Sequence, residues 1–381
     1  MHASQLFWKD LAGWSEDSEQ PVTAGLVLYF GSRAVLAEEA HYTALRQRFP
    51  EAQIVGCSTG GQMAGGDVSD QVLTALALDF TTTPLRVAEA KVDDPAQSHA
   101  AGAAIGAQLA APDLAGVFIL SDGLNVNGSA LVEGVVSAIG ANVPVSGGLA
   151  GDGADFAETL VGCNGRPQTH AVAAVGFYGD AIQFGHGSAG GWDVFGPKRK
   201  INRSTGNVLL EVDGKPALDL YKLYLGPDES QKLPGSALLF PMRISDPRHP
   251  ERSVVRTVLA VDAETGSMTF AGDMPEGWTA QLMRGSFGRL CAGAAEATHK
   301  AAQELDAHSA AAAILVSCIG RRLLMGQRID EEIEAATAEL PDNCRTIGFY
   351  SYGEISPHDV SRQVQLHNQT MTVTLMSEKA A

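Results

Sequence analysis

Residues 116–153, GVFILSDGLNVNGSALVEGVVSAIGANVPVSGGLAGDG, contain the pattern that decides the fold. An apolar run at 116–120 leads into a loop rich in glycine and polar residues, and apolar residues then recur at helical spacing over 130–139. A second apolar run follows and enters a glycine-rich turn. This order predicts a β-α-β unit, and the continuous apolar runs indicate strands buried on both faces. Ser129 is placed to cap the helix.

The same order occurs twice more. One copy joins GLVLYF to a helical stretch and the turn QIVGCSTGGQM, and the other joins AAILVS to a helical stretch and the turn RTIGFYSYGEIS. The helical stretches cover residues 34–48 and 329–340, and a strand-like segment follows each of the three units. We therefore expect a two-lobed α/β fold of repeated β-α-β units with mixed sheets. The three glycine-rich turns should lie on the same side of their sheets.

The chain over residues 192–251 differs, because short strand-like runs alternate there with glycine and proline. Residues 207–224 predict a strand, an Asp-Gly turn and a helix that begins near Pro216. We place a domain boundary near Gly214. The expected parts are an N-terminal extension (1–20), a first domain (21–214) and a second domain (215–377).

Composition excludes several classes of protein. The chain has 27 basic and 44 acidic residues, a net charge of −17, and no visible basic face for a nucleic acid. Its 5 cysteines are odd in number and widely spaced, which argues against a disulfide framework and a clustered zinc site. The start MHASQLFWKD does not fit a signal peptide, and no apolar stretch approaches the ~18 residues of a membrane span. We therefore expect a cytoplasmic protein without a nucleic-acid or membrane partner.

The turn GCSTG at residues 56–60 matches the G-x-S-x-G nucleophile elbow of serine hydrolases. The elbow requires a helix after the serine, but GQMAGGDVSD follows here. A hydrolase that uses Ser58 is therefore the less favoured alternative. We prefer a backbone turn at a strand end that lines a cavity, with these ligand contacts: Gly56, Cys57, Ser58 and Thr59.

Four residues lie at the corresponding strand ends of the second unit: Ser121, Asp122, Gly147 and Gly148. The turn GGLAGDG resembles a phosphate-cradling loop, but it lacks the lysine of a P-loop and the spacing of the dinucleotide fingerprint. If three such turns lie at equivalent places, three strand ends lie close together. Open α/β sheets bind ligands in crevices at such strand ends. We expect these four residues to contact a small ligand.

Two further groups of polar residues follow the strands of the third unit. Arg321 and Arg322 lie in the loop CIGRR, and Arg321 is our candidate to pair with a ligand carboxylate, since guanidinium binds carboxylates bidentately. An ordinary surface pair of arginines is the alternative. Tyr350, Tyr352 and Glu354 alternate along the chain and so share one strand face. Such a face suits ligand contact and equally suits an edge strand that faces water.

Two histidines are candidate ligand residues. His186 lies in GHGSAGGWDVFG, where small neighbours leave an imidazole free to bind a metal or haem iron. A histidine that is hydrogen-bonded in a glycine-rich turn is the alternative. His367 lies in the last strand, and a strand histidine with satisfied hydrogen bonds is its alternative. No H-E-x-x-H, C-x-x-C or EF-hand motif occurs.

Several of these segments resemble a known family. IVGCSTGGQ, FILSDGLNVNG and VPVSGGLAGDG resemble the N-terminal part of FIST proteins, and GRRLLMG, GFYSYGEISP and LHNQTMTVTLMSE resemble the C-terminal part. The resemblance implies a FIST N-terminal domain at 21–214 and a FIST C-terminal domain at 215–377. It implies a sensory, non-enzymatic module that binds small ligands such as amino acids. We expect this module to act on a separate signalling protein, and a homodimer is compatible with the sequence.

Within the family, FGHGSAGGWDVFG and NRSTGNVLLEVDGKPALDLYKLYLG resemble the NosP-type sensors. This resemblance implies a haem b cofactor, nitric oxide as the signal and a histidine kinase as the partner. It assigns the haem iron to His186, and the attachment is expected to be non-covalent because C-x-x-C-H is absent. Three alternatives stay open: a haem-free FIST sensor of amino acids or another small metabolite, an interaction scaffold without a ligand, and the serine hydrolase.

Overall fold

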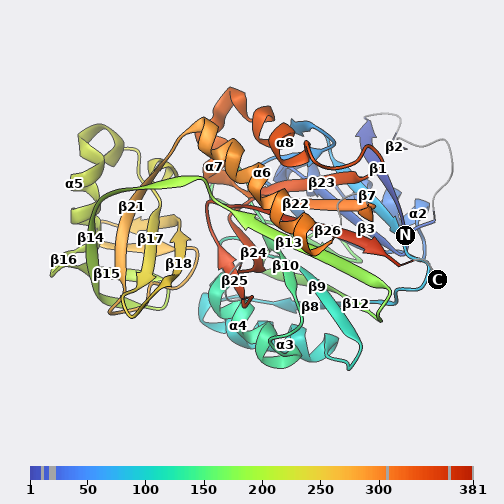
Figure 1. Cartoon of the computed structure of the whole chain (residues 1–381), viewed down its shortest axis with the longest axis horizontal. Coiled ribbons are helices and arrows are strands. Elements are labelled where there is room, and N and C mark those ends of the chain that lie inside the picture. The colour runs from blue at the N-terminus through green and yellow to red at the C-terminus, as the bar shows by residue number, and fades with distance from the viewer. Residues whose placement is uncertain (10–12, 17–22, 306–308, 359–361, 380–381) are drawn as a thin grey trace.

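The computed structural model describes residues 1–9, 13–16, 23–305, 309–358 and 362–379. These residues form a body of three six-stranded sheets and a smaller β-rich lobe at one end of it (Figure 1). The chain leaves the body for the small lobe near residue 191 and returns near residue 286. The expected two-lobed α/β fold with mixed sheets is therefore confirmed.

The first sheet contains the first β-α-β unit. Its elements are β1 (His2–Lys9), β2 (Gly13–Glu16), β3 (Leu26–Gly31), α1 (Arg33–Leu36), α2 (Glu39–Arg48), β4 (Gln53–Ser58), β7 (Thr74–Asp79) and β11 (Val161–Cys163). Strands β3 and β4 run parallel, and the order is β11-β4-β3-β7-β1-β2. The single helix expected at 34–48 is instead two helices, because Glu38 adopts an extended backbone with ψ 116°.

The second sheet contains the second unit. Its elements are β8 (Leu85–Lys91), η1 (Pro95–Gln97), α3 (Ser98–Leu109), β9 (Leu114–Ser121), α4 (Gly128–Ile139), β10 (Val145–Leu149), β12 (Ala171–Tyr178), β24 (Gly353–Pro357) and β25 (Val364–His367). The order is β25-β24-β10-β9-β12-β8, with β9 parallel to β10, and α3 and α4 cover one face (Figure 1). The expected cap was wrong by two residues. Asn127 caps α4 by accepting the N–H groups of Ser129 (3.1 Å) and Ala130 (3.2 Å), since the helix already begins at Gly128.

The third sheet contains the third unit. Its elements are β5 (Gln62–Ala64), β6 (Asp67–Ser69), β13 (Ile182–Ala189), α6 (Phe287–Glu304), β22 (Ala312–Cys318), α7 (Ile319–Met325), η4 (Gly326–Arg328), α8 (Asp330–Thr337), β23 (Arg345–Ser351) and β26 (Met371–Glu378). The order is β13-β26-β22-β23-β5-β6, with β22 parallel to β23. Most of the expected loop CIGRR belongs to α7 instead, so its two arginines lie on a helix.

The three sheets exchange strands in a cycle. After the turn of the first unit, β5 pairs with β23 of the third unit. After the turn of the third unit, β24 pairs with β10 of the second, and after the turn of the second unit β11 pairs with β4 of the first. Strand β11 begins only at Val161, because the Asp152 carboxylate accepts the N–H groups of Ala157 and Glu158 (2.9 Å each) and folds the preceding segment into a turn. The exchange brings the three glycine-rich turns together.

The small lobe is built on an eight-stranded antiparallel sheet. Its elements are β14 (Trp192–Thr205), β15 (Val208–Val212), β16 (Lys215–Pro216), α5 (Ala217–Ser230), η2 (Gly235–Leu239), β17 (Met242–Asp246), β18 (His249–Arg256), β19 (Val258–Asp262), β20 (Ser267–Phe270) and β21 (Thr279–Gly285). The expected strand, Asp-Gly turn and helix are confirmed as β15, the turn at Asp213 and Gly214, and α5. The expected domain boundary falls inside this lobe, between the paired strands β15 and β16.

The three sheets share one apolar interior. Strands β3 and β22 are buried along their whole length, as their continuous apolar runs predict. Phe30 from β3 and Phe349 from β23 contact each other there with ring centroids 4.6 Å apart, and Phe118 from β9 belongs to the same cluster. Each such side chain stabilises the fold by roughly 1.5–3 kcal/mol through burial. This shared core fixes the positions of the strand ends.

Candidate functional site

The three glycine-rich turns meet at one end of the body. We call residues 56–62, 147–153 and 348–354 the strand-end cluster. Backbone hydrogen bonds link the three turns in a ring, each turn donating to the next. These bonds run from Gly60 N to Tyr350 O (2.8 Å), from Tyr352 N to Leu149 O (3.2 Å) and from Gly151 N to Ser58 O (2.9 Å). The expectation that the turns lie on the same side of their sheets is therefore confirmed.

Ser58 is fully buried at the end of β4, and its Oγ accepts the N–H of Leu160 at 2.9 Å. Within the described residues, no imidazole or carboxylate is hydrogen-bonded to this hydroxyl. Strand β5, not a helix, follows the turn. Burial raises the pKa of the neighbouring Cys57 thiol well above its ordinary value, which disfavours the thiolate. Neither side chain has the surroundings of an activated nucleophile.

The remaining residues of the first turn support the backbone. A Cβ at Gly56 would overlap the backbone oxygen of Tyr29, so the glycine allows two strands to pack closely. The Thr59 hydroxyl lies 3.1 Å from Gln62 Oε1 and accepts the N–H of Gly61 at 3.2 Å. These polar atoms are satisfied inside the turn.

Asp122 fixes the loop after β9. One carboxylate oxygen accepts the N–H groups of Leu124 and Asn125 at 2.8 Å each, and the other accepts the N–H of His170 at 2.9 Å. Ser121, which is also buried, donates to the backbone oxygen of Asp122 at 3.1 Å. Both side chains therefore bond to the local chain.

The glycines of the second turn serve close packing between strands. A Cβ at Gly147 would overlap the backbone oxygen of Ile119, and the φ of Gly147 is +139°. A Cβ at Gly148 would come within 2.8 Å of the Val316 side chain. The turn resembles a phosphate-cradling loop in composition, but neighbouring residues pack directly against Gly147 and Gly148 and leave no space there for a phosphate.

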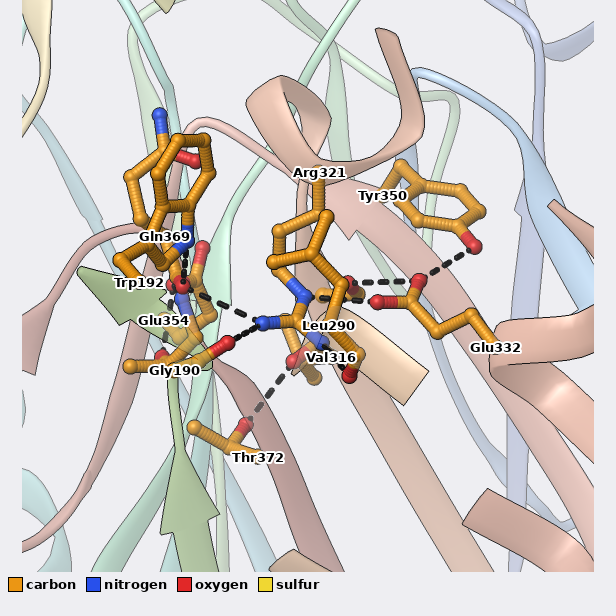
Figure 2. Close-up of polar contacts among 12 residues, drawn as sticks. Gly190, Trp192, Leu290, Val316, Arg321, Glu332, Tyr350, Glu354, Gln369 and Thr372 are labelled. Carbon is orange, nitrogen blue, oxygen red and sulfur yellow. Dashed lines mark hydrogen bonds and ion pairs between the residues drawn. The ribbon is translucent and has the colours of Figure 1, made fainter. Parts of the chain in front are cut away.

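Arg321 is fully buried and already paired with an internal carboxylate (Figure 2). Its Nε donates to Glu332 Oε1 at 2.6 Å and its Nη2 to the backbone oxygen of Leu290 at 2.8 Å. Its Nη1 donates to the backbone oxygen of Gly190. Glu332 also accepts the hydroxyl of Tyr350 at 2.9 Å, and this contact together with burial raises the pKa of Tyr350. Pairing of Arg321 with a ligand would require Glu332 to be displaced.

Arg322 lies at the edge of the cluster and binds Asp70 through both terminal nitrogens, at 2.6 Å each. The surface pair of arginines that the sequence left open therefore does not form, because the two side chains follow different directions from α7. The Arg321 side chain points into the core, and the Arg322 side chain lies at the edge of the strand-end cluster.

Tyr352 and Glu354 have separate partners. The Tyr352 hydroxyl donates to the Asp152 carboxylate, and its ring stacks on Phe156 with centroids 4.6 Å apart. Glu354 accepts the hydroxyl of Ser351 at 2.7 Å and that of Thr370 at 2.8 Å. Burial raises the pKa of Glu354 to about 8. The single strand face expected for Tyr350, Tyr352 and Glu354 was wrong, because the chain passes at Tyr352 from β23 in the third sheet to β24 in the second. All three residues are buried and bonded, so the alternative of a strand facing water is also wrong.

His186 lies on β13, not in an open turn, and its side chain is buried. The expected role of its glycine neighbours was wrong, because a Cβ at Gly185 or Gly187 would overlap backbone oxygens of α6, which packs against the strand there. The imidazole Nδ1 lies 3.5 Å from Thr374 Oγ1, and Nε2 has no hydrogen-bond partner among the described residues. Burial lowers the pKa of His186 to about 4, so the ring is neutral at pH 7.

His186 borders a groove of about 480 Å³, which we call the His186 groove. Its lining includes apolar side chains, a carboxylate and two cations: Pro144, Ile182, Phe184, Glu304, Arg362 and Lys379. The Phe184 ring lies nearly parallel to the imidazole, at 19° and 5.8 Å between centroids. The other candidate histidine, His367, lies at the end of β25 and not in the last strand, β26. Its Nε2 is 3.1 Å from the Ser356 backbone oxygen, which agrees with the alternative of a hydrogen-bonded strand histidine.

Comparison with protein families identifies the chain. A model of the FIST N domain matches residues 25–215, and a model of the FIST C domain matches residues 217–357. The chain is a FIST protein. It is therefore a sensory protein that binds a small ligand in signalling. Comparison with curated proteins gives no match.

The two FIST domains are interlocked in space. Strand β24 of the FIST C domain completes the second sheet beside β10, and β5 of the FIST N domain lies beside β23 in the third. The strand-end cluster therefore contains residues of both domains. Within the described residues, no helix of this FIST protein is long and apolar enough to cross a membrane.

Sequence reasoning missed a second groove in this FIST protein, at the junction of the body and the small lobe. Its volume is about 560 Å³, and Arg256 lies in its lining. The available signal was Arg256 itself, a single charge inside the otherwise uncharged run SVVRTVLAV. The groove is formed by α4, β17, β18 and β25, which are distant in sequence, so no local motif marks it.

Proposed function

We propose that this FIST protein is a haem-based nitric oxide sensor in which His186 supplies the iron ligand. The observation that supports the proposal is the buried Nε2 of His186, which has no hydrogen-bond partner among the described residues. A buried polar atom without a partner is uncommon and calls for an explanation. Neutral imidazole is the form of histidine that binds metals, and desolvation keeps this ring neutral.

The residues around the His186 groove fit a haem. Phe184, Ile182 and Pro144 offer apolar contacts for a porphyrin, and Lys379 and Arg362 offer cations for its propionates. Arg362 is itself held by Glu304, whose other oxygen accepts the backbone N–H of His186 at 3.0 Å. When bound, haem would supply the iron that takes up nitric oxide. The chain would hold the haem and orient the His186 ring through Thr374.

Haem uptake tests this proposal directly. Purified protein is titrated with haemin, and its absorption spectrum is recorded before and after reduction and addition of nitric oxide. We expect a Soret band that saturates, and we expect His186→Ala to lose or shift it while the circular dichroism of the fold is unchanged. His367→Ala is the matched control, since its ring is bonded to Ser356.

The outcomes separate the alternatives. An unchanged band in His186→Ala and a lost band in His367→Ala would move the ligand to His367. If the wild-type protein takes up no haem, the haem-free sensor of amino acids or another metabolite becomes the better interpretation.

We further propose that the output of this sensor is a separate histidine kinase. Autophosphorylation of candidate kinases from the same organism can be measured with the haem-free, haem-loaded and nitric oxide-treated protein. A rate that depends on the state of the sensor supports the proposal. Equal rates in all three states for every such kinase would contradict it.

A further inference from the structure

The groove between the body and the small lobe, which we call the interlobe groove, has the size and position of a ligand site. Its volume of about 560 Å³ lies in the range of small-molecule pockets, which favour domain junctions. Apolar side chains come from both sides, with Val136 on α4 facing Ile244, Val254 and Trp278 of the small lobe. Ala141 lines both the interlobe groove and the His186 groove.

Arg256 is the unusual group in this groove. Its side chain is 6% exposed, yet within the described residues no ion pair joins it to a carboxylate. Its donors reach neutral acceptors: the backbone oxygens of Asp273 (3.1 Å), Val255 (3.2 Å) and Leu366 (3.0 Å), and the Ser129 hydroxyl (3.4 Å). Buried charges in proteins are normally paired. Arginine also has one more N–H donor, on Nη2, than these bonds use.

The Asp273 carboxylate, which also lines the groove, is bonded to another side chain. Asp273 accepts the side-chain amide of Asn127 at 2.7 Å, and Asn127 in turn caps α4. Asp273 therefore raises the pKa of Arg256 only through space, while burial lowers it to about 10. The guanidinium remains charged at pH 7. Glu133, which is exposed and also lines the groove, disfavours a ligand that carries a second negative charge.

We propose that the interlobe groove binds a small monocarboxylate with an apolar body, whose carboxylate pairs with Arg256. The charge of Arg256 calls for an anion, and the walls of Val136, Val254 and Trp278 call for an apolar group beside it. Guanidinium binds a carboxylate with charge-assisted hydrogen bonds, which are stronger than those it now makes to neutral acceptors. This proposal rests on the small-ligand role of FIST proteins and does not depend on haem.

Arg256 also connects the groove to signalling. It belongs to β18 of the small lobe, and its Nη1 and Nη2 reach Leu366 and Ser129 of the body. A carboxylate that draws Nη2 toward the groove through its unused N–H would weaken the long 3.4 Å bond to Ser129. Binding would thereby alter a contact between the two lobes. A ligand shifts a conformational equilibrium only if it interacts differently with the two conformations, and the altered contact would supply that difference.

Two ligands of the same shape, one charged and one neutral, test whether binding requires a negative charge. Calorimetric titration with phenylacetate and with its neutral isostere phenylacetamide should give binding of the acid and at least about tenfold weaker binding of the amide. Acetate and inorganic phosphate, which lack the apolar body, should bind more weakly than phenylacetate. Equal binding of acid and amide, or no binding of phenylacetate, would overturn the proposal.

Two variants locate the site. Arg256→Gln should weaken phenylacetate binding by about tenfold or more, and Arg243→Gln on β17, whose side chain does not line the groove, is the charge-matched control. If Arg256→Gln does not fold, Val136→Trp keeps the test decisive, because it fills the groove from a partly exposed position on α4. Binding that survives both Arg256→Gln and Val136→Trp would place the ligand elsewhere. Unchanged phenylacetate binding in His186→Ala separates this site from the proposed haem site.

Discussion

The strand-end cluster and the two grooves differ in how their polar groups are satisfied. In the cluster and beside it, Arg321, Glu332 and Glu354 are buried and bonded to one another or to neighbouring hydroxyl and backbone groups. In the grooves, His186 Nε2 has no partner among the described residues and Arg256 has no carboxylate. The motifs that are easiest to recognise in the sequence therefore build the scaffold. Of the two groups left available for a ligand, Arg256 lies where no motif marks it.

The largest expected effect concerns the buried pair of Arg321 and Glu332 next to the cluster, which Glu332 contacts through Tyr350. Arg321→Met should destabilise the protein by about 3–5 kcal/mol, because it leaves the fully buried Glu332 carboxylate without its cation. Denaturant unfolding followed by circular dichroism measures this loss. Arg322→Met is the matched control, and it should cost about 1 kcal/mol or less because its partner Asp70 is largely exposed. If Arg322→Met lost more stability than Arg321→Met, the distinction between a structural buried pair and a dispensable surface pair would be wrong.

A second prediction concerns the pH dependence of the cluster. The folded-state pKa of Glu354 is raised by burial to about 8, above its ordinary value of 4.5, so the folded state holds a proton that the unfolded state has lost. Stability should therefore fall as pH rises from 4.5 to about 8, by up to about 1.4 kcal/mol per pH unit from this group. Glu354→Gln should remove that slope in denaturant titrations between pH 5 and 8. An identical slope in the variant would show that Glu354 is ionised in the folded protein.

The smallest expected effect concerns Ser58. Ser58→Ala should cost on the order of 1 kcal/mol, since the Leu160 N–H loses its acceptor, and should change no esterase activity. Turnover of p-nitrophenyl acetate by the wild-type protein and the variant measures the second point. Activity that is present in the wild type and lost in Ser58→Ala would make the strand-end cluster a catalytic site.

Local features of the sequence predicted the repeated units well. The buried runs became β3, β9 and β22, and the helical spacing became α2, α4 and α8. The exchange of β5, β11 and β24 was not predictable, because each of these strands is short and pairs with a unit far away in the chain. Residue spacing predicted Ser129 as the N-cap of α4. Asn127, whose backbone is extended, is the N-cap instead.

The candidate site was predicted less well than the fold, for a physical reason. Glycines near His186 indicated an open turn, but a glycine also permits close helix packing, and that is its use beside α6. The glycine content of a segment does not show whether its glycines form an open turn or allow a helix to pack closely. The position of Arg321 after a buried strand was read correctly, while its partner Glu332 could not be inferred without the packing of α7 against α8. Arg256 became a candidate only when the small lobe was placed against α4.

The cyclic exchange of strands has a consequence for synthesis on the ribosome. The first sheet lacks an edge strand until residue 163 has emerged, the second lacks β25 until residue 367, and the third lacks β26 until residue 378. The FIST N domain is thus translated with unpaired edges on β10 and β5. Exposed strand edges invite pairing with other chains. The nascent protein must therefore keep these two edges apart from other chains until β23 and β24, which end at residues 351 and 357, have been synthesised.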